Sequence, residues 1–157
     1  MQHVLQVSRK IDYGLRAMIY LASVTEGTVV PFREIAKAMD IPQDFLAKIL
    51  KTLVNGGLVH SVRGARGGYR LERPPRDISF LDVIEAVEGP VRLNLCLSDA
   101  GKGECGLSPS CTMYAIWQQG QERMLEVYRS ARLDALAMTQ AERPLSTLRT
   151  PETTPAP

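Results

Sequence analysis

The chain has 157 residues, of which 45% are hydrophobic and 23% charged, and its formal net charge is +2. This length supports one compact domain with an appendage or two small modules, and the hydrophobic fraction excludes a wholly disordered chain. Because the net charge is close to neutral, nucleic-acid binding has to be argued from where the basic residues lie. No segment is apolar enough to span a membrane, and the first residues lack the pattern of a signal peptide. We therefore expect a cytoplasmic protein with no membrane contact.

The first third of the chain carries three helical patterns separated by helix-stopping residues. Ser8 is placed to cap a helix over about 9–24, which is followed by helices over 32–39 and 43–54. Pro42 separates the second helix from the third. In the third helix the apolar spacing places five residues on one face: Phe45, Leu46, Ile49, Leu50 and Leu53.

The next segments predict a hairpin, a short helix and one long helix. Two β-prone runs, 58–62 and 68–72, are joined by the basic, Gly-rich sequence RGARG, and a helix over 80–88 then ends at Gly89. Residues 112–141 predict a single dimerisation helix. Along it, small or apolar residues recur at alternating steps of four and three positions: Met113, Trp117, Gly120, Met124, Val127 and Ala131. A helix with this coiled-coil spacing usually buries the seam against a second copy. The Pro- and Thr-rich residues 142–157 predict a disordered tail.

Together these elements predict a mostly α fold with a small β-hairpin wing, namely a winged helix-turn-helix followed by a long C-terminal dimerisation helix. In such a module the third helix lies in the DNA major groove and the wing tip reaches the flanking backbone or minor groove. The candidate DNA-contacting residues are polar or cationic side chains of these elements: Arg33, Gln43, Lys48, Lys51, Thr52, Ser61, Arg63, Arg66 and Tyr69. Taken alone, the lysines could form a solvated helix face and the hairpin an ordinary turn. Their occurrence together, in the right order, favours DNA binding.

All three cysteines lie between residues 96 and 111, in a C-x8-C-x5-C array within a Gly- and Ser-rich stretch. Thiolates gathered in one loop are typical ligands of a soft metal centre. An odd number of thiols in the reducing cytosol argues against structural disulfides. A zinc site remains an alternative, although the array lacks the C-x2-C knuckle usual for structural zinc. A metal-free switch, in which oxidation joins two of the thiols, is a further alternative.

Motifs of catalysis are missing from the sequence. We find no nucleophile–base pair, no Walker-type phosphate loop and no dinucleotide fingerprint. We therefore expect a protein that is not an enzyme.

The sequence from Arg63 to Gly89, followed by the cysteines and a long helical run, resembles the BadM/Rrf-type family of bacterial transcriptional regulators. This family includes the iron–sulfur sensors IscR and NsrR. The most specific pieces are the wing sequence RGARGGY and the helix sequence DVIEAVEG, and the phrase IDYGLRAMIYLA in the first helix is similar too. The resemblance covers about residues 1–135. It implies a homodimer in which the long helices pair and two winged helices face successive major grooves of a pseudo-palindromic operator in double-stranded DNA.

The resemblance also implies an iron–sulfur cluster held by Cys96, Cys105 and Cys111. IscR-like proteins place a histidine three residues after the last cysteine, where this chain has Tyr114. NsrR-like proteins instead use an aspartate in the first helix of the partner subunit, a position that Asp12 matches. Asp12 could equally be a surface residue near the positive start of its helix. We favour Asp12 as a ligand from the partner subunit and a 4Fe–4S cluster, with a 2Fe–2S cluster as the alternative.

The sequence therefore predicts a dimeric transcriptional regulator, most simply a repressor. Its operator affinity would depend on a cluster that senses nitric oxide, redox state or iron supply. We divide the chain into a winged helix-turn-helix domain (1–90), a cysteine-rich cluster-binding loop (91–111), a dimerisation helix (112–141) and a tail (142–157). The alternative is a metal-free or zinc-binding winged-helix regulator that acts as a thiol switch.

Overall fold

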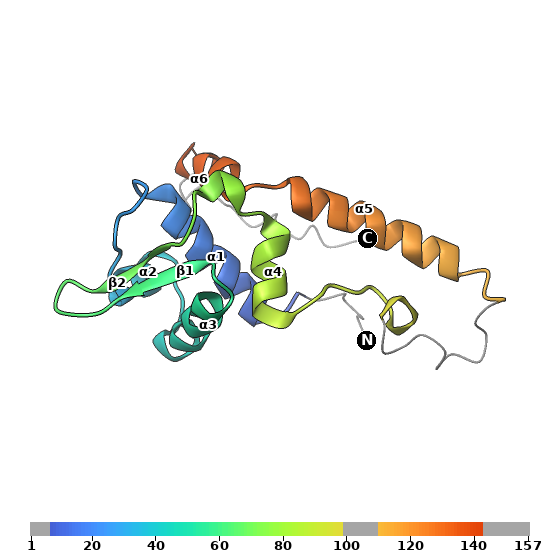
Figure 1. The fold of residues 1–157 in the computed structure, drawn as a ribbon, viewed down its shortest axis with the longest axis horizontal. Helices are drawn as coiled ribbons and strands as arrows, with labels where there is room; N and C mark the ends of the chain where they lie inside the picture. Colours follow the sequence, from blue (N-terminus) through green and yellow to red (C-terminus); the bar gives the residue numbers. More distant parts are fainter. Residues whose placement is uncertain (1–6, 99–109, 143–157) are drawn as a thin grey trace, which may run out of the picture.

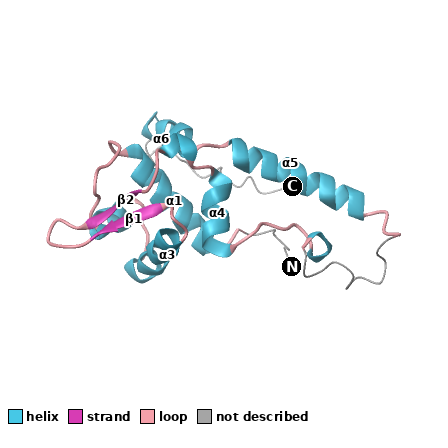
Figure 2. Ribbon diagram, in the orientation of Figure 1, coloured by secondary structure: helices cyan, strands magenta, loops and turns pink. Residues whose placement is uncertain are grey.

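The computed structural model describes residues 7–98 and 110–142. Its elements in chain order are α1 (Arg9–Ser23), α2 (Phe32–Ala38), α3 (Gln43–Asn55), β1 (Val59–Val62), β2 (Gly68–Leu71), η1 (Pro75–Asp77), α4 (Phe80–Glu88), η2 (Leu95–Leu97), α5 (Tyr114–Ser130) and α6 (Leu133–Glu142). Helices α1 to α4, the hairpin and α6 form one head, and α5 extends away from it (Figure 1). Within residues 7–98 and 110–142, colouring by secondary structure shows helices and one two-stranded hairpin, joined by loops (Figure 2). The predicted fold class, a winged helix-turn-helix with a C-terminal helix, is confirmed.

Side-chain caps fix where two helices of the head begin. The Ser8 hydroxyl accepts a hydrogen bond from the backbone N–H of Ile11, so α1 begins where the sequence predicted. At the start of α4, Ser79 and Asp82 form a reciprocal capping box, with bonds of 2.8 and 3.1 Å. Each cap satisfies backbone N–H groups that a helix leaves unpaired at its first turn.

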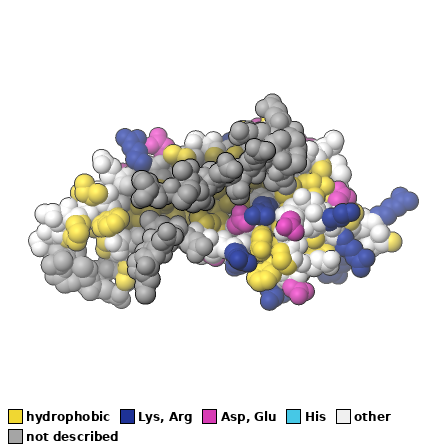
Figure 3. All heavy atoms as spheres, turned by 180° about the vertical axis from the view of Figure 1, so that it is seen from behind, with side chains coloured by type: hydrophobic (Ala, Val, Ile, Leu, Met, Phe, Trp, Pro, Cys, Tyr) yellow, Lys and Arg dark blue, Asp and Glu magenta, His cyan; other side chains and the backbone are white. Residues whose placement is uncertain are grey.

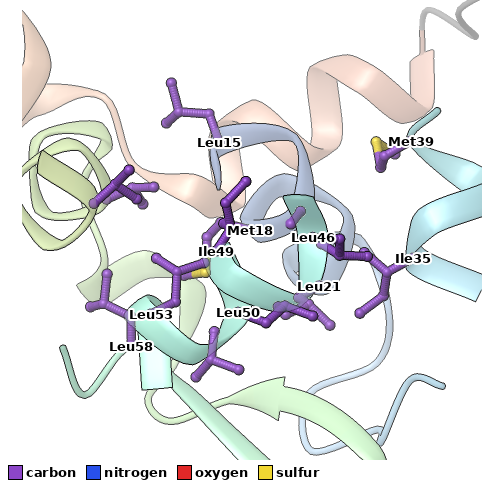
Figure 4. Packing of buried hydrophobic residues seen from close by; sticks show 14 of the residues in the cluster. Leu15, Met18, Leu21, Ile35, Met39, Leu46, Ile49, Leu50, Leu53 and Leu58 are labelled. Carbon is purple, nitrogen blue, oxygen red and sulfur yellow. The ribbon is translucent and has the colours of Figure 1, made fainter. Parts of the chain in front are cut away.

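The core of the head lies between α1, α3 and α4, where helix α3 buries one apolar stripe (Figure 4). Leu46, Ile49, Leu50 and Leu53 are at most 1% exposed. The prediction that Phe45 belongs to this stripe is wrong, because its side chain is 53% exposed. Each helical residue rotates by about 100°, which places Phe45 beyond the edge of the stripe that Leu46 begins. Its ring packs instead against Tyr13 of α1.

The wing is an antiparallel hairpin fastened to the loop between α1 and α2. Strands β1 and β2 pair with Val59 opposite Leu71 and Val62 opposite Gly68. Val30 exchanges backbone hydrogen bonds of 2.8 and 2.9 Å with Tyr69. A Cβ atom on Gly68 would lie 2.2 Å from the carbonyl oxygen of Val30, so only glycine permits this close approach. The hairpin is thus hydrogen-bonded to the head through this loop.

The prediction of one continuous helix over residues 112–141 is wrong. Helix α5 ends at Ser130, and Ala131 adopts an extended conformation. Arg132 forms a bridge with Ser79, in which Phe80 donates to the carbonyl of Ala131 at 2.8 Å. The chain then turns into α6, which packs against α1. Burying Leu133 completely in the head compensates for interrupting the helix.

Most side chains of helix α5 are exposed to solvent in the single chain. Leu125 is the one buried residue of this helix. Large apolar side chains elsewhere on α5 and at its start are exposed to solvent: Met113, Ile116, Trp117 and Val127. None of the helices in the ranges 7–98 and 110–142 combines the length and hydrophobicity needed to cross a bilayer.

Because Leu133 is buried in the head, we expect Leu133→Ala to lower the free energy of unfolding by about 2–5 kcal/mol. Met138→Ala on the same helix removes a side chain that is 66% exposed and serves as the matched control, with little expected change. Denaturant unfolding followed by circular dichroism measures both. Equal stability of the two variants would contradict the packing of α6 on the head.

Candidate nucleic-acid interface and cysteine segment

The outer face of α3 presents polar, cationic and small side chains. Gln43, Lys48 and Lys51, three of the predicted DNA contacts, are exposed on this helix, as are Asp44 and Ala47, which the sequence analysis did not single out. Since the opposite face of α3 is buried in the core, these side chains form the part of the helix that can enter a groove.

Two other predicted contacts lie near this face. Thr52 is half-buried, and its hydroxyl donates to the carbonyl of Lys48 at 3.0 Å, which leaves it less free to contact DNA. Arg33 lies exposed on α2. The structure therefore leaves Gln43, Lys48, Lys51 and Arg33 as the accessible predicted side chains of the helix-turn-helix.

The wing carries exposed cations at its tip. Arg63 and Arg66 are exposed, and neither guanidinium has an ion-pair partner among the residues that the structure describes. A guanidinium without a carboxylate partner is free to bind a phosphate. Ser61 is exposed on β1, directly opposite Tyr69, which is half-buried and packs against the core. Tyr69 therefore helps to place the wing as well as being a candidate contact.

Figure 3 shows the charged side chains on the face of the molecule that is turned away from the viewer in Figure 1. Lys and Arg side chains gather over the end that carries the head, with a few acidic side chains among them (Figure 3). On this visible face of the head, cations therefore outnumber acidic side chains, although the net charge of the whole chain is only +2.

Phe45 is the residue on α3 that sequence reasoning misplaced. Its ring lies in the first turn of the helix, and its centroid is 6.0 Å from that of Tyr13, with the two planes at 63°. Such an edge-to-face pair is a favourable aromatic geometry that restricts the orientation of the ring. Hydrophobicity alone does not reveal this position: four other apolar residues already complete the buried stripe, and a fifth at its edge can lie inside or outside it.

The two described cysteines flank the segment 99–109. Cys96 lies in η2 and Cys111 lies shortly before α5, and both are half-buried free thiols. Cys105 lies outside the described residues, so the predicted three-thiol site is not tested. Within the described ranges, no three His, Cys, Asp or Glu side chains gather where they could hold a metal ion.

The segment that carries Cys96 is attached to α5. The backbone N–H of Leu93 donates to the side-chain oxygen of Gln121 at 3.0 Å, and Leu93 also packs beside Gly120. Asn94 then caps η2 by accepting from the N–H of Leu95 at 2.8 Å. Cys96 therefore follows, three residues later, a backbone group that is hydrogen-bonded to α5.

Asp12 lies in the first turn of α1. Its side chain is 48% exposed and pairs with Arg16 at 2.8 Å. The Arg16 guanidinium also lies over the Tyr13 ring, 5.7 Å from its centroid, and Tyr13 contacts Phe45 of α3. The carboxylate is thus accessible to a partner subunit, and contacts within the chain connect it to α3. To bind elsewhere, Asp12 would have to leave Arg16.

A groove of about 530 Å³ separates the head from α5, and apolar side chains such as Ile11, Ile84 and Met124 line it. At its edge the Ser8 hydroxyl hydrogen-bonds to the Glu88 carboxylate, and the ammonium of Lys10 donates to the carbonyl of Val87 at 2.7 Å. These bonds tie the start of α1 to the end of α4. The helix with Asp12 and the linker that leads to Cys96 therefore begin at one fixed corner of the head.

A reading helix, a basic wing and a helix that extends from the head define a DNA-binding transcriptional regulator. The chain belongs to the Rrf2 family, whose model is described as an iron-dependent transcriptional regulator and matches residues 7–139. Members of this family are transcriptional regulators and not enzymes, as the sequence predicted.

Curated relatives agree with this assignment. An HTH-type transcriptional regulator of Mycobacterium tuberculosis (strain ATCC 25618 / H37Rv) is 36% identical over 134 residues, which cover 85% of this chain and 81% of the relative. The protein aau3 of Rhizobium meliloti (strain 1021) is 31% identical over 138 residues, which cover 88% of each chain.

Solved structures of two regulators share the fold. CymR, described as the global cysteine regulator of B. subtilis, superposes with a TM-score of 0.72 at 31% identity, over 87% of this chain and 98% of CymR. IscR of T. potens superposes with a TM-score of 0.67 at 31% identity, over 88% of this chain and 91% of IscR. CymR is thus described as a regulator of cysteine, whereas IscR is one of the iron–sulfur sensors to which the sequence was compared above.

Because Arg63 and Arg66 lie exposed at the wing tip, we expect the double variant Arg63→Ala/Arg66→Ala to bind DNA more weakly. The slope of log affinity against log salt should flatten by about 0.9 for each phosphate contact that is lost. Fluorescence anisotropy over a salt series measures this slope. Arg129→Ala, which removes an exposed arginine of α5, is the control. An unchanged slope in the double variant would exclude the wing from the interface.

Proposed function

We propose that this chain is a homodimeric transcriptional repressor whose affinity for a pseudo-palindromic operator depends on an iron–sulfur cluster. The observation that carries the proposal is the position of the cysteines. Cys96 and Cys111 are free thiols at the two ends of the segment that precedes α5, the helix through which we propose that the chain dimerises. The description of the family as iron-dependent supports the choice of iron. Because its target would be chromosomal DNA, we propose a cytoplasmic location.

The donor set fits a soft cluster. Cys96, Cys105 and Cys111 would supply three thiolates, the ligands that iron–sulfur clusters prefer. Asp12 of a partner subunit would supply the fourth ligand of a 4Fe–4S cluster; a 2Fe–2S cluster is the alternative. When bound, the cluster would supply metal–ligand bonds that the cluster-free chain lacks.

The protein's own residues would pass this difference to DNA along two routes. A hydrogen bond between Leu93 and Gln121 joins the cysteine segment to α5, so a change in the loop conformation would shift this proposed dimerisation helix. Asp12 would act on α3 through the chain of contacts that runs from Arg16 to Tyr13 and Phe45. Changes along either route would alter the spacing of two α3 helices on an operator. A coupling of about 1–3 kcal/mol, typical of allosteric proteins, changes affinity by roughly 5- to 150-fold.

The exposed apolar side chains of α5 support the homodimer. Met113, Trp117 and Val127 are 55%, 41% and 62% exposed and follow coiled-coil spacing with Gly120 and Met124. Such a seam is stable in water when a second copy covers it. The dimer would set the half-sites of the operator about 34 Å apart.

A thiol switch is the second candidate. A crystal structure of Staphylococcus aureus CymR in an oxidized form shares this fold at 30% identity, with a TM-score of 0.63. Oxidation could join two of the three cysteines in the present chain and move the same segment. A zinc site on these cysteines is the remaining alternative.

The experiment on the cofactor is visible absorption and metal analysis of protein purified without air. We expect brown, iron-containing protein that nitric oxide bleaches. Colourless protein with one equivalent of zinc would show that these cysteines bind zinc and not a cluster. Colourless, metal-free protein would favour the thiol switch.

If Asp12 is the fourth ligand, Asp12→Ala should lose the cluster faster on exposure to air than the unmodified protein. Asp77→Ala removes an exposed carboxylate from η1 and is the matched control. Decay of the visible band over time measures both variants. Equal decay rates in the two variants would remove Asp12 from the ligand set.

The α5 seam predicts that Trp117→Glu shifts the protein from dimer to monomer, because a buried charge opposes pairing of the helices. Gln119→Glu places the same charge on the outer face of the helix and should leave the dimer intact. Sedimentation velocity distinguishes the two masses. A Trp117→Glu protein that remains dimeric would show that the dimer forms through another surface.

A further inference from the structure

We infer that Phe45 is a specificity-determining residue that contacts the 5-methyl group of a thymine in each operator half-site. The inference deepens the proposed function, since it rests on α3 lying in the major groove. It starts from the unexpected exposure of this ring: an aromatic side chain that is 53% exposed lies in the first turn of α3, outside the buried stripe.

The position of Phe45 favours contact with bases. In a helix-turn-helix protein, the N-terminal residues of the reading helix contact base edges. Lys48 lies one turn further along α3 and is exposed, so it can bind a phosphate beside the same stretch of groove. The ring of Phe45 would then be carried into the groove beside an anchored cation.

The chemistry of the ring selects its target. Phenylalanine neither donates nor accepts a conventional hydrogen bond, so it cannot read the polar edges of guanine, cytosine or adenine. Thymine is the base that offers an apolar group in the major groove, its 5-methyl group. Burying the methyl group and the exposed ring against each other would remove apolar surface of both from water.

The contact with Tyr13 restricts the orientation of the Phe45 ring before DNA binds. The edge-to-face pair, with ring centroids 6.0 Å apart, holds the Phe45 ring against α1 before DNA arrives. A side chain that is already oriented loses less conformational entropy when it binds. A pair of α5 helices is a poor candidate for covering Phe45, since α3 belongs to the head and α5 extends away from it (Figure 1).

The test removes the methyl group from the DNA. Full-length protein, purified without air, first selects duplexes from a random-sequence pool. Each thymine of the preferred duplex is then replaced by deoxyuridine, which lacks only the 5-methyl group. We expect one thymine per half-site at which this replacement weakens binding about fourfold, the value for one buried methyl-sized group. At that position Phe45→Ala should bind the thymine and uracil duplexes equally well.

Two variants serve as controls. Phe45→Leu keeps an apolar side chain and should retain part of the preference for thymine. Lys48→Ala should weaken binding to both duplexes by the same factor, because a phosphate contact does not sense the methyl group. Phe45 is largely exposed, so its variants should fold, and their thermal unfolding is measured alongside.

Photochemical crosslinking gives an answer that needs no variant. 5-Iodouracil places an iodine atom where the methyl group of thymine lies, and irradiation joins it to an aromatic side chain in contact. We expect the critical position to crosslink to Phe45, identified by mass spectrometry of the peptide. If Phe45→Ala binds DNA too weakly to measure, the crosslink alone shows whether Phe45 contacts the methyl position of the thymine.

Three results would overturn the inference: wild-type protein indifferent to uracil at every position, a Phe45→Ala variant that keeps the full preference for thymine, or a crosslink to another residue. Failure of the proposed placement of α3 looks different. In that case Lys48→Ala and Lys51→Ala would leave all DNA binding unchanged, with or without a preference for thymine.

Discussion

The buried stripe of α3 is the constraint on which the rest of the structure depends. Leu46, Ile49, Leu50 and Leu53 are almost completely inaccessible to water, and their contacts with α1 and α4 fix the rotation of the helix about its own axis. Once this rotation is fixed, Gln43, Lys48 and Lys51 necessarily face outward. The surface that we propose to face DNA is thus determined by packing on the opposite side of the same helix.

A second constraint sets how α5 leaves the head, on which it packs through α4. The bridge between Ser79 and Arg132 and the burial of Leu133 bring the chain back onto α1 after α5 has ended. Helix α5 is therefore attached at its end through Ala131 and near its middle through the bond between Leu93 and Gln121. The second attachment belongs to the linker that carries Cys96. An event at the cysteines and a movement of α5 are for this reason mechanically connected in the proposed mechanism.

Patterns that depend on local chemistry could be predicted from the sequence. The cap at Ser8, the helix stop at Gly89 and the hairpin between the two β-prone runs are confirmed, because each follows from neighbouring residues. The break at Ala131 could not be predicted, because it arises from pairing with Ser79, far away in the sequence. Phe45 was misplaced because hydrophobicity identifies apolar residues without telling which of them lies beyond the edge of a buried stripe. Family resemblance supplied the three cysteine ligands and Asp12, and their roles stay predictions; the structure adds the partner of Asp12, Arg16.

The central claim is that occupancy of the cysteine segment controls affinity for DNA. The most direct measurement is the Kd of one anaerobic preparation for its selected duplex, before and after iron is removed by a chelator, with the oligomeric mass recorded in both states. The account predicts that the stripped protein binds that duplex roughly 5- to 150-fold more weakly, as expected for ordinary allosteric coupling. Equal affinity of the iron-loaded and stripped dimers would contradict it.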